Sequence, residues 1–488
     1  MGIKRYTAEA DNTITNAYKP NLRSRATGSN MGLSDSVEVF YIYGQQDSGS
    51  SELSRVLIQF PMTQITTDRA NGVLPASGNV SFHLRMFNAR HPYTLPREYD
   101  MIVSTVSRAW NEGTGLDMED YSNSGSSNWT TAGSASSGVT AWTTAGGDYH
   151  AEPRFTASFE NGTEDIEIDV SDAVERWLAG SRDNYGFGVR MEDETALSSS
   201  YTKKFFARGT EFFFRRPLIE ARWDSATRDD RGNFYFSSSL ATSEDNLNTV
   251  YLYNYVRGRL RDIPDIGTGS IHVSIYSGSA DNSEPTGSRI VKVVDGTHVI
   301  TDNPYVVTGG HVSTGIYSAS FALTAASNPL TTAFDVWHSG TTQFATSSFS
   351  PKKLESLAYN PYSRYVINIT NLRDRYYRNE TAQFRLYSRN KDWQPTIYVK
   401  ASAVPENNLV ESGSYKVVRI VDNLDVIPFG TGSDNHTHLS YDVSGSYFDL
   451  DIDMLEAGYS YGIKFAFYDD GAQSWNEYPD IFKFRVEE

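Results

Sequence analysis

The chain has 488 residues and a formal net charge of −17 at pH 7, so it is too long for one hydrophobic core and two to four domains are expected. The acidic residues are spread along the chain and no basic stripe offsets them, which argues against binding to nucleic acid or to an anionic membrane. Cysteine is absent and no run of about 18 apolar residues occurs. We therefore expect no disulfide, no membrane span and synthesis in a reducing cytoplasm.

Aromatic residues make up 13% of the sequence, with 31 Tyr and 25 Phe. Short apolar runs are separated by stretches of Ser, Thr, Gly and Asn. This composition is typical of all-β proteins, whose strands favour aromatic and β-branched side chains. We predict an all-β fold of three consecutive β-sandwiches, at residues 1–228, 229–400 and 401–488.

Alternating apolar and polar residues predict the strands of the first block. These expected strands are at 6–14, 37–43, 54–60, 80–86 and 102–110. In SRVLIQF, Val56 and Ile58 point to one face, while Leu57 points to the other. At least one face of each strand is apolar enough to line a core.

The pattern changes from strand to helix and back between residues 166 and 191. Ile166 and Ile168 alternate with acidic residues, and then Val174, Trp177 and Leu178 recur at helical spacing. Gly180 ends the predicted helix before a new strand begins. We predict a short amphipathic helix that closes one end of a sandwich, with Trp177 as its plug.

Residues 114–150 are rich in Gly, Ser, Thr and Asn but include Trp129 and Trp142. Two tryptophans are unusual in a flexible linker, so we predict an ordered loop in which both rings act as anchors. The alternative is that Trp129 and Trp142 are exposed and stack against a glycan.

Eight segments of this block occur in the order seen in DNRLRE domains, which the chain resembles over roughly residues 5–224. They are DNTIT (11–15), SRVLIQF (54–60), WNEGTG (110–115), NWT (128–130), WTTAGGD (142–148), DVSDAVERW (169–177), NYGFGV (184–189) and RRPLIEARW (215–223). The resemblance implies a jelly-roll-like β-sandwich, related to carbohydrate-binding modules and often fused to surface proteins. It implies a fold more strongly than a function, because such sandwiches have unrelated roles.

Turn-separated short strands predict further sandwiches in the rest of the chain. The second block has expected strands at 250–255, 270–277, 289–294, 316–323, 365–369, 382–387 and 396–400, and one expected helix at Ser350–Leu357. After a Pro/Asn linker at 401–409, an Ig-like sandwich of about seven strands is expected. Its clearest strand is Ser446–Met454.

The whole chain is also similar to virion structural proteins of marine tailed phages, cyanophages especially. The segments that carry this resemblance are ATGSNMGLSDSVEVFYIYGQQ (26–46), YRNETAQFRLYSRNKDWQPTIYVKA (377–401) and LSYDVSGSYFDLDIDMLEAGYSYGIKF (439–465). It implies a component of an assembled particle, without fixing the position in that particle. A cysteine-free acidic chain suits a particle assembled inside a bacterium.

Two groups of residues are candidates for metal binding. Asp449, Asp451 and Asp453 alternate on one strand, where carboxylates at i and i+2 lie about 6.5–7 Å apart. We predict a solvated face, and the alternatives are a calcium site and a charged face toward a partner. His436 and His438 could share a metal around a symmetry axis, but polar turn residues are the simpler interpretation. We therefore predict no catalytic residue, no metal ligand and no cofactor.

These observations favour a non-enzymatic virion protein that binds other particle proteins as a homo-oligomer. A peripheral neck, collar, tail-accessory or capsid-decorating position is expected. The alternative is a carbohydrate-binding adhesin that contacts the host surface through Trp129 and Trp142. A glycosidase that depolymerises host polysaccharide is the third hypothesis, and it would need two carboxylates across a cleft.

Overall fold

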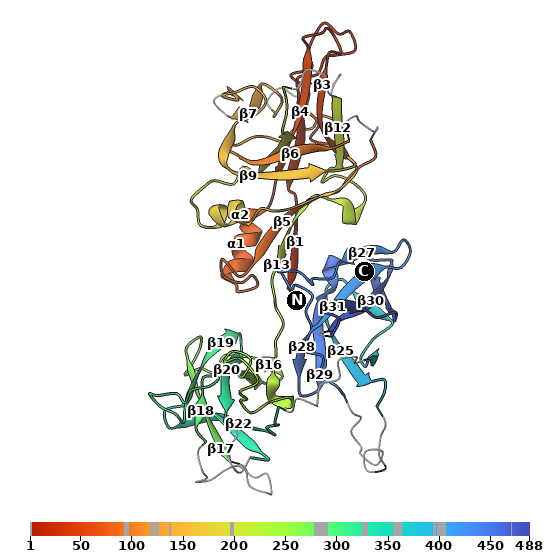
Figure 1. Cartoon of the computed structure of the whole chain (residues 1–488). Helices are drawn as coiled ribbons and strands as arrows, with labels where there is room; N and C mark the ends of the chain where they lie inside the picture. The colour runs from red at the N-terminus through yellow and green to blue at the C-terminus, as the bar shows by residue number, and fades with distance from the viewer. Residues whose placement is uncertain are drawn as a thin grey trace. The chain divides into compact units, whose positions relative to one another are not determined.

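A computed structural model of the chain describes residues 2–91, 97–117, 122, 126–135, 138–195, 200–277, 291–324, 330–354, 364–393, 397, 407–469 and 471–488 (Figure 1). Among the described residues, strands make up 47% and helices 6%, which confirms the predicted all-β, sandwich-type fold. The chain divides into two compact units, Gly2–Asp224 and Ser225–Glu488. Within the described ranges, no helix is long and apolar enough to cross a membrane.

The first unit is a sandwich of two antiparallel sheets. One sheet has the order β1 (Ile3–Thr7), β13 (Leu218–Arg222), β5 (Ser81–Met86) and β10 (Ile166–Asp169). The other has the order β12 (Ser200–Phe206), β3 (Ser36–Tyr43), β4 (Ser51–Gln59), β11 (Phe187–Met191), β6 (Tyr99–Val106) and β9 (Tyr149–Phe159), and β2 (Ala10–Thr15) also pairs with β4. Strands β4, β5 and β6 alternate between the sheets, and β1 pairs with β13, as in a jelly roll.

The core of the first unit lies between these sheets and follows the two-residue period of the strands. Phe82 and Leu84 of β5 face Val56 and Ile58 of β4 across it, and all four side chains are fully buried. Leu57 is equally buried but belongs to a second apolar cluster on the opposite face of β4. Strand β4 therefore carries a core on each of its two faces.

Two helices, α1 (Met62–Ala70) and α2 (Ser171–Leu178), lie side by side at one end of this unit (Figure 1). An ion pair joins them, with Arg69 Nη2 at 2.7 Å from Glu175 Oε1. Trp177 is buried, and its ring centroid lies 4.9 Å from that of Phe187. The predicted helix and its tryptophan plug are confirmed, whereas α1 was not predicted.

The second unit begins with a seven-stranded antiparallel sheet wrapped on its own core. Its order is β14 (Asn248–Tyr253), β20 (Ile316–Leu323), β19 (Val307–Ser313), β17 (Ile271–Ser277), β21 (Ala333–Ser339) and β22 (Thr342–Phe349), and β18 (Val293–Val294) also pairs with β20. The first residues of β19 pair with β17 and the later ones with β20. A short hairpin, β15 (Tyr255–Val256) and β16 (Arg259–Leu260), follows β14.

The predicted helix at Ser350–Leu357 is wrong over the residues that the structure describes. Lys352 forms a parallel β-bridge with Tyr235, and its backbone N–H donates to the Phe234 carbonyl at 2.9 Å. This extended backbone is incompatible with a first helical turn at Pro351. The remainder of that prediction, 355–357, lies outside the described residues.

The last sandwich begins earlier than predicted. One sheet has the order β23 (Tyr365–Ile369), β25 (Thr381–Asn390), β29 (Gly445–Asp451) and β28 (Ser440–Asp442). The other has the order β24 (Arg375–Tyr377), β32 (Phe482–Glu487), β30 (Ser460–Asp469), β26 (Gly413–Arg419) and β27 (Leu424–Ile427), and β31 (Ser474–Glu477) pairs with β30.

The expected boundary after residue 400 is therefore corrected. Residues 381–386 of β25 pair with β29, and Phe384 stacks on Phe448 with ring centroids 5.1 Å apart. Both strands were predicted, but they were assigned to different domains, because sequence periodicity does not reveal long-range pairing. The expected strand Ser446–Met454 ends at Asp451 and continues as a 3₁₀ turn. Most of the expected strand at 396–400 lies outside the described residues.

Residues 227–231, which we call the strap, connect the two parts of the second unit. The backbone N–H of Asp229 donates to the Tyr441 carbonyl of β28 at 3.0 Å, and Tyr441 donates back to the Thr227 carbonyl at 2.9 Å. From the same strap, Asp230 accepts from the backbone of Thr249 at 2.6 Å. The strap is thus an ordered segment that hydrogen-bonds to β14 of the seven-stranded sheet and to β28 of the last sandwich.

Candidate functional site

The two tryptophans proposed as glycan contacts are buried. Trp129 is 7% exposed and Trp142 is 6% exposed, and both pack with Leu57 and Trp110 against the outer face of β4. The Trp142 indole Nε1 donates to the backbone carbonyl of Asn128 at 2.9 Å. The prediction that the two rings anchor their loop is therefore confirmed, and the alternative, in which exposed Trp129 and Trp142 stack against a glycan, is wrong.

Several of the sequence motifs meet in one buried polar network. Asn12, of DNTIT, donates to the carbonyl of Ser127 at 2.9 Å and accepts from the backbone of Met31 at 2.7 Å. Asn30 donates to the carbonyl of Glu112, of WNEGTG, at 2.6 Å. Both asparagines have no exposed surface. They form hydrogen bonds with backbone N–H and carbonyl groups of three loops, and these buried groups would otherwise be unpaired.

Asp11 lies at the edge of this network. Its Oδ2 accepts from the backbone N–H of Arg208 at 2.6 Å, and the Arg208 guanidinium forms an ion pair with Glu112 at 2.5 Å. Burial raises the pKa of Asp11 to about 7, although the hydrogen bond from Arg208 opposes the shift. Asp11 can therefore titrate near neutral pH, but it sits inside the fold and not in a cleft.

Lys203, on β12, is a second buried titratable group. Its side chain is fully buried, and the Nζ donates to the carbonyl of Glu164 at 2.6 Å, to Asn88 Oδ1 at 2.8 Å and to the carbonyl of Gly162 at 3.1 Å. Burial lowers the pKa of Lys203 to about 8. All three ammonium donors are used, so this lysine fastens the turn at 162–164 to the sheet.

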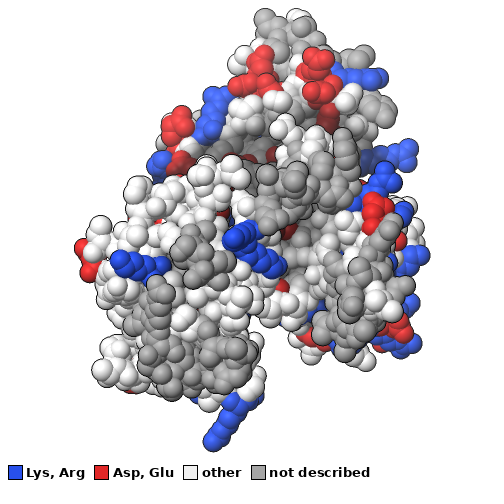
Figure 2. Space-filling view, turned by 60° about the horizontal axis from the view of Figure 1, so that its bottom comes forward, with Lys and Arg blue, Asp and Glu red and all other residues white. Residues whose placement is uncertain are grey.

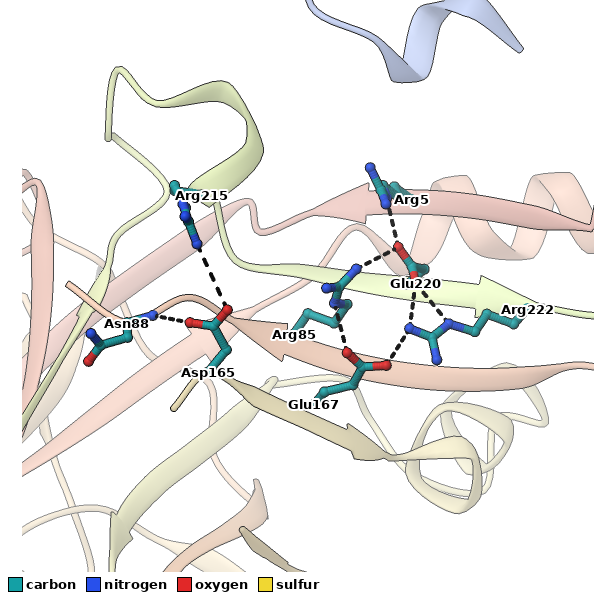
Figure 3. Close-up of polar contacts among 8 residues, drawn as sticks. All are labelled: Arg5, Arg85, Asn88, Asp165, Glu167, Arg215, Glu220 and Arg222. Atoms are coloured by element: carbon teal, nitrogen blue, oxygen red, sulfur yellow. Dashed lines mark hydrogen bonds and ion pairs between the residues drawn. The ribbon is translucent and has the colours of Figure 1, made fainter. Parts of the chain in front are cut away.

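An arginine–glutamate cluster covers the four-stranded sheet (Figure 3). Glu220 of β13 is fully buried and accepts from Arg5 at 2.7 Å, Arg222 at 2.7 Å and Arg85 at 3.2 Å. Arg222 and Arg85 also contact Glu167 of β10, at 2.5 and 3.4 Å. The cluster therefore joins β1, β13, β5 and β10 side by side.

The charge balance of this cluster is structural. Burial alone would raise the pKa of Glu220, but Arg5, Arg85 and Arg222 together lower the pKa well below its usual value. A carboxylate kept ionised in this way is a poor general acid. Sequence reasoning missed this cluster. The alternation in RRPLIEARW nevertheless places Glu220 and Arg222 on one face of the strand, opposite the apolar side chains at 219 and 221.

The acidic row at Asp449, Asp451 and Asp453 does not gather around a common point. Asp451 accepts from the backbone N–H of Asp453, and Asp453 pairs with Arg378 at 2.9 Å. Across the described ranges, no group of three or more His, Asp or Glu side chains is placed to hold a metal ion. Figure 2 shows acidic and basic side chains interspersed over the face drawn.

His436 and His438 instead line a cavity of about 170 Å³ in the second unit, which we call the junction pocket. Its walls come from the hairpin β15–β16, from β26 and β29, and from Thr227 of the strap and its neighbour Ser225. Four tyrosines contribute to the lining, at 253, 255, 415 and 447. Asp449 lies among them, so one member of the acidic row faces this pocket.

The electrostatics of the pocket favour neutral tyrosines. Burial, reinforced by nearby Asp449, raises the pKa of Tyr415, and burial likewise raises the pKa of Tyr253 and Tyr447. These hydroxyl groups therefore remain protonated donors at physiological pH. Sequence reasoning singled out His436 and His438 but not the tyrosines, which come from three separate stretches of the chain.

No family model matches the sequence, and no curated protein matches it. The solved structures that are similar include Salmonella alpha-2-macroglobulin reacted with methylamine, at 8% identity and a TM-score of 0.15 over 99% of this chain and 26% of that chain. Another is dimeric latent PorU from Porphyromonas gingivalis, at 10% identity and a TM-score of 0.15 over 99% of this chain and 34% of that one. This chain thus spans about a quarter to a third of their lengths, and similarities this low carry no argument about function.

Proposed function

We propose that this chain is a non-enzymatic structural component of an assembled particle, with a phage virion as the particle that the sequence resemblance implies. It would bind other particle proteins through the outer surfaces of its sandwiches and occupy a peripheral neck, collar, tail-accessory or capsid-decorating position. Particle symmetry would make it a homo-oligomer.

The observation that carries the proposal is that the buried polar side chains form hydrogen bonds and ion pairs within the fold. Asn12, Asn30 and Lys203 each use their donors on the backbone or side chains of loops. Glu220 is held by three arginines across adjacent strands. Such networks fix loops and strands in one conformation, which suits a protein whose product is a rigid surface rather than a reaction.

The adhesin alternative no longer has the site first expected for it, because Trp129 and Trp142 are buried. The glycosidase hypothesis requires a pair of carboxylates, one of them with a raised pKa, separated by roughly 5–10 Å across an open cleft. Asp11 has a raised pKa, but it lies inside the polar network, where its carboxylate accepts from the Arg208 backbone, and not in an open cleft.

The test is to find the chain in purified particles. Particles from an infected marine host would be banded by density, washed in high salt and digested for peptide mass spectrometry. We expect peptides of this chain at a fixed ratio to the major capsid protein, with a non-structural protein of the same infection as the negative control. Intact particles that lack the chain would refute the proposal, as would hydrolysis of host polysaccharide by the purified chain.

A further inference from the structure

The junction pocket has the size and lining of a site for one small ring-shaped ligand. Its volume of about 170 Å³ is close to that of protein cavities of roughly 150 Å³ that accept a six-membered ring. Unlike those cavities, it is lined by hydroxyl, imidazole and carboxylate groups. Polar, convergent groups in a concave site are what orient a small ligand.

One of these groups, the Tyr415 hydroxyl, forms no hydrogen bond with the described residues. The Tyr415 side chain is 1% exposed. The ring is held in place, because it stacks on Phe448 with centroids 4.0 Å apart and an interplanar angle of 20°. A buried, fixed and unpartnered hydroxyl carries a free-energy penalty that a ligand bound in the pocket would remove.

The other lining residues divide into an apolar lip and a polar interior. Tyr255 is 61% exposed and, with Leu260, belongs to the hairpin β15–β16, which lines the pocket together with Ile316 of β20. On the side of the last sandwich, Tyr415 and Asp449 supply a hydroxyl donor and a carboxylate acceptor. Aromatic rings stack on the C–H face of a sugar, and a carboxylate accepts from its hydroxyl groups.

We propose that the junction pocket binds a single uncharged sugar ring, of hexopyranose size, with Tyr255 against its face and Tyr415 and Asp449 bound to its hydroxyl groups. An uncharged sugar is favoured over an acidic one because Asp449, the one carboxylate that the described residues contribute to the lining, would repel a negative charge. This inference is separate from the particle role, since a particle protein can lack a sugar site and a sugar-binding protein can lie outside particles.

The experiment uses the full chain and saturation-transfer NMR with the methyl glycosides of glucose, galactose, mannose and N-acetylglucosamine. We expect transfer to at least one of the four, with a dissociation constant on the order of 1 mM, as is usual for a ligand of this size. Tyr415→Phe should weaken binding about tenfold by removing one hydrogen bond. Tyr255→Ala should weaken it by at least about tenfold by removing the stacking face.

Two control variants separate binding from folding. Tyr461→Phe removes a hydroxyl that donates to the Glu456 carbonyl at 2.8 Å, so it should lower Tm without changing the dissociation constant. Tyr377→Ala removes an exposed ring outside the pocket and should change neither. In contrast to Tyr461→Phe, Tyr415→Phe should leave the Tm of the unliganded chain unchanged or raise it, because its hydroxyl has no partner to lose.

The absence of transfer to all four glycosides would overturn the inference. So would binding that Tyr415→Phe and Tyr255→Ala leave unchanged. A fall in Tm with Tyr415→Phe as large as that with Tyr461→Phe would also overturn it, since the hydroxyl would then already be satisfied by ordered water in the pocket.

Discussion

The indole Nε1 of Trp142 donates to the backbone carbonyl of Asn128, and this bond closes a loop over the outer face of β4. The carbonyl is buried together with the ring, so replacing the tryptophan costs both apolar packing and a hydrogen bond. The bond therefore makes the loop at 128–142 part of the folded unit.

We expect Trp142→Ala to destabilise the first unit by about 3–5 kcal/mol, the usual cost of removing a large buried ring. Trp142→Phe should cost less, about 1–3 kcal/mol, chiefly because the Asn128 carbonyl loses its donor. Urea unfolding of the full chain, followed by tryptophan fluorescence, measures both. On a glycan array neither variant should differ from the wild type, and binding lost specifically with Trp142→Ala in a folded protein would contradict the buried position.

Glu220→Gln should destabilise the first unit by about 3–5 kcal/mol, because three arginines would lose the carboxylate that compensates them. The folded-state pKa of Glu220 is lowered, so its contribution is present above the unfolded pKa of about 4.5 and is lost as the pH falls below it. Urea unfolding at pH 7 and pH 3.5 tests this. The exposed pair Arg154–Glu192 supplies the control, because Glu192→Gln should change stability by about 0–1 kcal/mol at either pH.

Lys203 predicts a second rise of stability with pH, on the alkaline side. Its folded-state pKa is about 8, below the ordinary 10.5, so between these values the unfolded chain binds more protons than the folded one and stability rises with pH. Lys203→Met should remove this rise. It should also lower the free energy of unfolding by about 2–4 kcal/mol, because the carbonyls of Glu164 and Gly162 and the Asn88 Oδ1 would lose their donor. The difference between wild type and Lys203→Met, followed from pH 7.5 to 9.5, isolates the lysine from tyrosines that titrate higher.

Asp11 should make the protein less stable as the pH rises from about 4 to 7. Its folded-state pKa, about 7, lies above the ordinary 3.8, so the folded protein retains a proton that the unfolded chain has released. Asp11→Asn keeps an acceptor for the Arg208 N–H and removes the buried charge. We expect it to stabilise the protein by on the order of 4 kcal/mol at pH 8 and to change little at pH 3.5. Equal unfolding midpoints for the two proteins at pH 8 would show that the pKa of Asp11 is not raised in the folded protein.

Local patterns predicted much of the first unit. The alternation in SRVLIQF and the helical spacing of Trp177 and Leu178 each correspond to an observed element. Helix α1 was missed for a physical reason: Met62–Ala70 contains three threonines, buries only Ile65 and has no side-chain cap. Such a segment becomes helical through its contacts with α2 and the core, and sequence propensity alone does not show this.

The residues that line the junction pocket are far apart in the sequence, so local patterns could not predict the site. Tyr255, Tyr415 and Asp449 belong to β15, β26 and β29, three segments that are far apart in the sequence and line one pocket in the folded chain. A pattern read within a window of 18 residues carries no information about such proximity. For the same reason, the predicted boundary of the last sandwich was wrong: it was placed after residue 400, and β25 was assigned to the preceding domain.

The strap also determines where the chain can be cut. Residues 227–229 form hydrogen bonds with Tyr441 along the outer strand β28, and the Tyr441 hydroxyl donates to Asp230 at 2.7 Å. A fragment that starts after residue 231 would leave β28 as an open edge, and open edges recruit strands from other molecules. Expression fragments of the last sandwich should therefore carry the strap if they are to remain monodisperse.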